Sequence, residues 1–107
     1  MKININPLSV NKAFRGRRFK TDEYKRYEKE VMYLLKPLKV PEGKLFVSIN
    51  FGFSSKLADI DNPVKLFIDI LQKKLKFNDR HIYKLHLEKE IVSKGKEFID
   101  FKIKSIK

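Results

Sequence analysis

The sequence contains no cysteine and no tryptophan, and only four glycines and four prolines among 107 residues. The absence of cysteine excludes disulfide bonds, thiolate metal sites and a cysteine nucleophile. No apolar run approaches the roughly 20 residues that a membrane-spanning helix needs. The segment from Met1 to Lys20 is also too polar for a signal peptide. We therefore expect a soluble protein that works in the cytoplasm.

Acidic residues are scarce as well, with 13 Asp and Glu against 25 Lys and Arg, which gives a formal net charge of +12. Such an excess on a small surface favours polyanions, and nucleic acid is the commonest of them. A compositional bias towards lysine codons is the alternative explanation. The length and the 42% hydrophobic content predict a single domain over residues 1–107 with a packed core.

The order of hydrophobic patterns predicts an α+β fold. Alternation of apolar and polar residues over Leu45–Phe53 predicts a strand. Helical spacing predicts one helix that Thr21 caps and Pro37 ends, and a second over Pro63–Leu75 with Asn62 as its cap. Three further strands, of which the last two form a hairpin, complete a β-α-β-α-β-β order with a mixed or antiparallel sheet: Lys2–Ile5, Arg80–Val92 and Phe98–Ile106.

The segment Asn6–Lys20 has no hydrophobic period and no acidic residue, which predicts a long basic loop. Loops of this length are usually functional, so we expect it to contact a nucleic-acid backbone. Phe14 and Phe19 either stack on exposed bases or return to the core. A merely solvated loop is the alternative. The expected contacts are Lys12, Arg15, Arg17, Arg18 and Lys20.

The stretch from Asp59 to Lys65 is the strongest candidate for chemistry. In an extended segment Asp59 and Asp61 would point to the same side, as a pair of hard oxygen ligands that suits Mg²⁺. Lys65 follows Asp61 by one helical turn and could hold a phosphate. Ordinary helix capping and an Asp61–Lys65 ion pair explain the same residues. The spacing by itself leaves both interpretations open.

The run Asp59-x-Asp61-Asn62-x-x-Lys65, followed by Asp69 and then Asn78-Asp79, resembles the signature of the RusA family of Holliday junction resolvases. Most of the chain is covered by the resemblance, which implies a RusA-like fold. It also implies a homodimeric endodeoxyribonuclease that resolves four-way DNA with Mg²⁺ or Mn²⁺ in recombination and repair, in association with the nucleoid. Less specific similarities are Pro7-x-Ser9-x-Asn11, Gly16-Arg17-Arg18 and Tyr27.

By this resemblance, Asp59, Asp61 and Asp79 correspond to the metal-binding aspartates of the family, and Lys65 corresponds to its catalytic lysine. The implied chemistry is metal-assisted phosphodiester hydrolysis. Asn78 is a departure, because relatives can carry a second acid there. The alternative function is a non-catalytic basic module that binds DNA or RNA, in which the aspartates are caps.

The length of the second helix bears on how Asp79 reaches the other two aspartates. An intact helix over Pro63–Leu75 is about 20 Å long. The four residues that end at Asp79 can retrace at most ~13 Å of it. Asp79 is therefore expected at the far end of the helix from Asp59 and Asp61. An antiparallel homodimer would bring it to the pair of the other chain, which predicts a metal site shared between subunits.

Overall fold

The structure, a computed structural model, describes residues 1–15 and 19–106, and it describes only the backbone of Val10, Phe14, Arg15 and Phe19. A four-stranded mixed sheet with the order β1-β6-β4-β5 dominates the fold. Within it β4 pairs antiparallel with β6 and parallel with β5. The prediction of an α+β fold with a mixed sheet is confirmed. The strands are β1 (Lys2–Ile3), β4 (Leu45–Phe53), β5 (Ile82–Ile91) and β6 (Phe98–Ser105).

The last two strands do not form a hairpin, so that prediction is wrong. Strands β5 and β6 lie on opposite sides of β4. Helix α3 (Val64–Leu75) connects β4 to β5, and a helical crossover of this kind joins parallel strands. The segment 92–97 then passes the end of β4, where Val92 N donates to Phe53 O at 2.7 Å. An alternating pattern identifies a strand without identifying its neighbour, which is why the sequence misled here.

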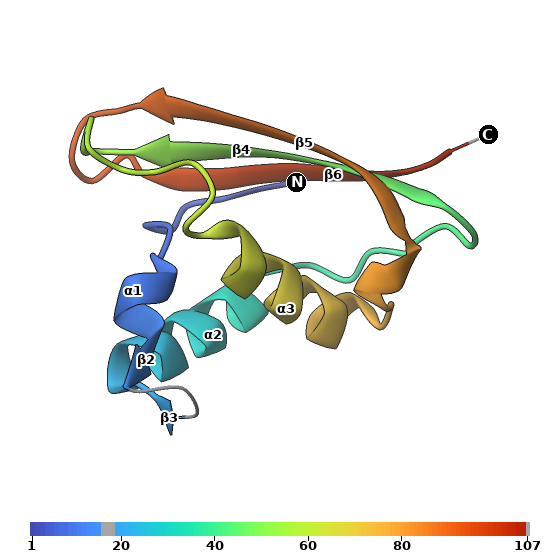
Figure 1. Cartoon of the computed structure of the whole chain (residues 1–107), viewed down its shortest axis with the longest axis horizontal. Helices are drawn as coiled ribbons and strands as arrows, with labels where there is room; N and C mark the ends of the chain where they lie inside the picture. The colour runs from blue at the N-terminus through green and yellow to red at the C-terminus, as the bar shows by residue number, and fades with distance from the viewer. Residues whose placement is uncertain (16–18, 107) are drawn as a thin grey trace.

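Two helices, α2 (Asp22–Leu34) and α3, cover the same face of the sheet, as Figure 1 shows. The core between the layers centres on aromatic rings. The ring centroid of Phe67 in α3 lies 5.5 Å from that of Phe101 and 6.5 Å from that of Phe51, and both ring pairs are edge to face. In the described part of the chain no helix lies over the opposite face, where β4 presents Phe46, Ser48 and Asn50. None of the described helices is long and apolar enough to cross a membrane.

Helix α2 begins at the residue that the sequence predicted. The Thr21 hydroxyl accepts a hydrogen bond from Tyr24 N at 3.1 Å, which satisfies a main-chain donor of the first turn. Tyr24, Tyr27 and Val31 then fall on the buried face. The helix ends at Leu34, three residues before a proline. This helix shows that capping chemistry and periodicity together determined one element of the fold.

The segment between β1 and α2 is more structured than a long loop, so that prediction is wrong for its described residues. It contains α1 (Val10–Ala13) and an antiparallel pair of short strands, β2 (Phe14–Arg15) and β3 (Phe19–Lys20). The Thr21 hydroxyl donates to Lys12 O at 2.7 Å and ties the segment to α2. Elements of two to four residues are too short to produce a hydrophobic period, so the sequence pattern could not reveal them.

Candidate active site

The loop that joins β4 to α3 carries Asp59 and Asp61. Helix α3 begins at Val64, with Pro63 as N-cap and no side-chain hydrogen bond to it. Asn62 is therefore not the cap that the sequence predicted; its Nδ2 donates to Asp59 Oδ2 at 3.3 Å instead. The main chain closes the turn, since Val64 N donates to Asp61 O at 3.2 Å. Among the described residues neither carboxylate receives a hydrogen bond from the helix, so capping explains neither of them.

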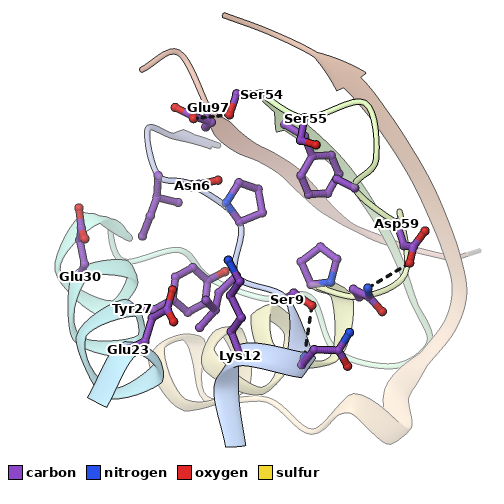
Figure 2. A pocket seen from close by; sticks show the side chains of 18 of the residues that line it. Asn6, Ser9, Lys12, Glu23, Tyr27, Glu30, Ser54, Ser55, Asp59 and Glu97 are labelled. Atoms are coloured by element: carbon purple, nitrogen blue, oxygen red, sulfur yellow. Dashed lines mark hydrogen bonds between the residues drawn. The ribbon is translucent and has the colours of Figure 1, made fainter. Parts of the chain in front are cut away.

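Asp59 and Asp61 face two different hollows. The chain bends at Ile60 and Asp61, so the two aspartates do not share one side of an extended segment, and that expectation is wrong. Asp59 borders a hollow of about 860 Å³ between the N-terminal segment and the end of β4, and Figure 2 shows it at the rim. Asp61 borders a groove of about 490 Å³ between α3 and β5. Its exposed carboxylate has no partner among the described residues.

Lys65 is the second residue of α3 and contacts two acidic side chains. Its Nζ is 3.0 Å from Asp69 Oδ1 and 3.7 Å from Asp79 Oδ2. The hydrogen bond and charge of Asp69, with a smaller contribution from Asp79, raise the pKa of Lys65 above its usual range. The ammonium is therefore fully charged at neutral pH. Asp61 is not its ion-pair partner. The Asp61–Lys65 ion pair, the second structural explanation considered for this motif, is therefore excluded.

Asp79 returns alongside α3 because the chain reverses sharply at the end of that helix. Lys76 has the left-handed conformation, with φ 59 and ψ 54, and Asp79 opens the 3₁₀ helix η1 (Asp79–His81). Its main-chain N donates to Oε1 of Gln72 at 2.7 Å. The carboxylate of Asp79 reaches Lys65 of its own chain at 3.7 Å and lines the same groove as Asp61. Asp59 lies at another hollow, and the described residues place no three acidic, histidine or cysteine side chains together for a metal ion. That Asp79 meets both aspartates only across a dimer therefore stays a prediction.

Gln72 is the residue that sequence reasoning missed. It lies outside the apolar stripe of α3, and its sequence position gave it no assigned role. Its side chain contacts both Asp69, at 3.4 Å, and the backbone of Asp79, at 2.7 Å. The available signal was its position seven residues after Lys65, which places both on one helical face.

The groove between α3 and β5 brings three of the four predicted catalytic residues together. Asp61, Lys65 and Asp79 line it beside apolar side chains of both elements. Asp59 lies at the other hollow. Among the described residues no three acidic, histidine or cysteine side chains lie close enough to one another to hold a metal ion. The groove thus offers two carboxylates and the ammonium of Lys65 to an incoming ligand, and Lys84 also lines it.

Two of the five predicted DNA contacts have described side chains. Lys12 is exposed and extends from α1 into the hollow that Asp59 borders (Figure 2). Lys20 pairs with Glu28 at 3.4 Å and lies over the ring of Tyr24 at 5.1 Å, so part of its charge is compensated. Arg17 and Arg18 lie outside the described residues, as does the side chain of Arg15.

Comparison with known families identifies the class of protein. The family model described as Endodeoxyribonuclease RusA matches residues 5–101 of the 107-residue chain. No curated protein matches the chain significantly. The chain belongs to the RusA endodeoxyribonuclease family. The resemblance inferred from Asp59, Asp61, Lys65 and Asp79 is confirmed at the level of the family.

Family membership decides between the two functions that the sequence left open. The protein is an endodeoxyribonuclease, a hydrolase of DNA phosphodiester bonds, that acts on Holliday junctions and binds branched DNA. Nucleases of the family generally depend on a divalent metal. The alternative, a non-catalytic basic module, is therefore rejected.

Proposed function

We propose that this protein resolves four-way DNA junctions in recombination and repair by Mg²⁺-dependent hydrolysis, as one domain of residues 1–107 acting on cytoplasmic DNA. The observation that carries the proposal is the groove in which Asp61 and Asp79 lie with the ammonium of Lys65. If these side chains formed only a structural ion-pair network, each carboxylate would have a partner. Asp61 has none among the described side chains. An unpartnered carboxylate beside a cation favours a ligand site over a structural network.

Asp61 and Asp79 are the proposed metal ligands, and their chemistry fits a divalent cation. Mg²⁺ is commonly held by one or two carboxylates, with waters and substrate phosphate completing its shell, and Mn²⁺ accepts the same donors. When bound, the ion would polarise the scissile phosphate and lower the pKa of a coordinated water. The lack of a three-acid cluster in the described part of the chain is compatible with such a sparse protein ligand set.

Asp59 is the third proposed ligand, although it borders the neighbouring hollow. A single long hydrogen bond from Asn62, at 3.3 Å, holds its exposed carboxylate. A bond of this kind contributes on the order of 1 kcal/mol, so breaking it costs little. Because Asp59 and Asp61 flank the same bend, a modest change in the loop can turn both towards one ligand.

Lys65 is proposed to offset charge on the phosphate. Negative charge grows on the phosphate oxygens during the attack of water, and a preorganised cation stabilises that charge without reorganising at the moment of reaction. Asp69 holds the ammonium at 3.0 Å and thereby restricts its position. The raised pKa of Lys65 favours its protonated form, so it can act as a positive charge beside the phosphate.

Lys12, Arg15, Arg17, Arg18 and Lys20 are the proposed contacts to the DNA backbone. Support comes from Lys12, which reaches into the hollow that Asp59 borders (Figure 2). A strand that crosses this hollow would therefore pass the acidic loop. Phosphate contacts of this kind position the DNA without reading its sequence.

We further propose that the active form is a homodimer. A four-way junction presents two equivalent strands to cut, and a two-fold dimer presents two equivalent sites. The edge strand β5 exposes Tyr83 and Leu85 beside the groove, 65% and 41% exposed respectively. Exposed apolar side chains on a free edge are a surface that a second copy can cover. The groove would then lie at or near the subunit interface.

A nicking assay on a synthetic four-way junction tests the proposed function. The wild-type protein should cut only when Mg²⁺ is present. Asp61→Asn and Asp79→Asn should each reduce cutting by about 100-fold or more, because they remove charge from the metal site, while junction binding is retained. Asp100→Asn is the matched control, since Asp100 pairs with the N-terminus away from the groove. Cutting in the presence of EDTA, or full activity of both groove variants, would refute the proposal.

A mixed dimer decides whether the metal site is shared between subunits. One chain carries Asp61→Asn and the other Asp79→Asn. A shared site leaves one site with both substitutions and one intact, so nicking of one strand returns. A site within one chain leaves both sites damaged and nicking absent. The position of Asp79 beside Lys65 of its own chain favours the second outcome.

A further inference from the structure

The side chain of Gln72 links the two elements that carry the acidic residues of the groove. Its Oε1 accepts a hydrogen bond from the main-chain N of Asp79 at 2.7 Å. Its Nε2 lies 3.4 Å from Asp69 Oδ1 and 3.5 Å from Ile68 O. One carboxamide therefore contacts the partner of the Lys65 ammonium, the helix backbone and the turn that carries Asp79.

The spacing along α3 makes this arrangement specific to one helical face. Lys65, Asp69 and Gln72 follow one another at intervals of four and three residues, so their side chains form a single stripe. Asp79 contacts both ends of that stripe, since its main-chain N meets Gln72 at 2.7 Å and its carboxylate meets Lys65 at 3.7 Å. The stripe is partly exposed, with Lys65 at 69% and Asp69 at 33% side-chain exposure. Solvent competition makes individual contacts here weak, so the position of Asp79 depends on several of them.

The turn that carries Asp79 has few other attachments to α3. Asn78 accepts from Arg80 N at 2.9 Å and His81 N donates to Asn78 O at 3.1 Å, but both bonds lie within the turn itself. Lys76 N bonds Gln72 O at 3.0 Å, at the point where the helix ends. At 2.7 Å, the bond from Asp79 N to Gln72 Oε1 is shorter than these three bonds.

We propose that Gln72 is a positioning residue of the nuclease: it holds the backbone of Asp79 against α3 and so sets the distance between the Asp79 carboxylate and Lys65. The proposal rests on the proposed function, in which Asp79 and Lys65 act on the same phosphate. Gln72 acts only through Asp79 and Asp69 and does not touch substrate. Groups of this kind behind metal ligands typically affect metal affinity or activity by 10- to 100-fold.

Two substitutions of Gln72 distinguish the effect of its hydrogen-bond acceptor from the effect of the rest of its side chain. Gln72→Met keeps the length of the side chain and removes the acceptor. Gln72→Glu keeps an Oε acceptor for Asp79 N and removes the donor to Asp69. We expect Gln72→Met to lower the cleavage rate at saturating Mg²⁺ by about 10- to 100-fold, with junction affinity changed by less than about 2-fold. Gln72→Glu should retain more activity than Gln72→Met.

Hydrogen exchange of the Asp79 amide, followed by NMR in metal-free protein, is the readout independent of cleavage. It should become at least about 5-fold faster in Gln72→Met, the factor that corresponds to a net hydrogen bond of about 1 kcal/mol. In Gln72→Glu it should stay near the wild-type value. Continued protection of the amide in Gln72→Met would overturn the proposal, and so would wild-type cleavage by that variant.

Asn78→Ala is the matched control for a general loosening of the turn. It removes a comparable hydrogen bond, in which the side-chain oxygen of Asn78 accepts from the backbone N–H of Arg80, one residue before Asp79. If Asn78→Ala and Gln72→Met lower the melting temperature equally, only Gln72→Met should lose cleavage to the stated extent. Equal loss of cleavage by both would overturn the specific role of Gln72. If the wild-type protein fails to cut, the proposed function is refuted instead. Hydrogen exchange of the Asp79 amide still tests whether Gln72 holds the Asp79 backbone.

Discussion

At the scale of single residues, the ammonium of Lys65 is shared between one acid of its own helix and one acid of a distant turn. Asp69 holds it at 3.0 Å and Asp79 at 3.7 Å. The pKa of Lys65 is raised chiefly by Asp69, so the group stays charged across the neutral range. Three charges with a net value of −1 therefore lie beside the unpartnered carboxylate of Asp61. An excess of negative charge of this kind favours a cation over a phosphate group.

Replacement of Lys65 by methionine should affect chemistry more than DNA binding. We expect Lys65→Met to lower the cleavage rate of a four-way junction by about 100-fold or more, because a charge that stabilises the transition state is lost. Junction affinity should fall by only a few-fold. Lys74→Met, the same change about two and a half turns further along α3, controls for the loss of one positive charge. Equal effects of the two variants on cleavage would contradict a specific role for Lys65.

At the scale of elements, Glu28 connects three parts of the fold. It belongs to α2 and pairs with Lys73 of α3 at 2.8 Å and with Lys20 of β3 at 3.4 Å. Burial by itself would raise the pKa of Glu28, but the hydrogen bonds and charges of the two lysines outweigh burial and lower it. The same carboxylate thus holds the two helices together and anchors the end of the basic segment.

The lowered pKa of Glu28 predicts how its contribution to stability depends on pH. A carboxylate whose pKa is lower in the folded protein stabilises it above the unfolded pKa, near 4.5. That contribution disappears as the pH falls through the lower, folded value. At pH 7, Glu28→Gln should reduce the free energy of unfolding by about 1 kcal/mol, and the difference should vanish in acid. Urea unfolding at several pH values measures this, with the exposed Glu30→Gln as control; a loss independent of pH would contradict it.

At the scale of the whole molecule, the chain carries a formal net charge of +12, and the groove between α3 and β5 is lined by two carboxylates, Asp61 and Asp79, and by Lys65 and Lys84. The overall excess of positive charge favours DNA as a partner. The proposed function assigns this excess to DNA binding and the two carboxylates of the groove to a cation.

The salt dependence of binding measures how many basic side chains contact phosphates. Replacing Arg17 and Arg18 with glutamine should make the slope of log affinity against log salt shallower by about 1 to 2 units. The matched control replaces Lys102 and Lys104, on the helix-free face of β6, and should leave the slope unchanged. An unchanged slope for the arginine pair would remove the basic segment from the DNA interface.

Local interactions along the chain made much of this protein predictable. The Thr21 cap, the alternation over β4 and the apolar stripe of α3 each depend on residues close in sequence, and each element appears where its pattern predicts. The motif from Asp59 to Lys65 likewise identified the family, because its residue types and their spacing lie within one short segment of the sequence. Composition indicated a polyanion as the partner.

Only the tertiary structure decided which residues meet. The parallel placement of β5 beside β4 depends on where a crossover helix can pack, and no strand pattern records that. Asp79 reaches Lys65 because the chain reverses at Lys76 and because Gln72 binds a backbone N–H, and both are properties of the folded chain. Short-range patterns determined the elements of this protein and its chemistry, whereas packing determined the distances on which that chemistry depends.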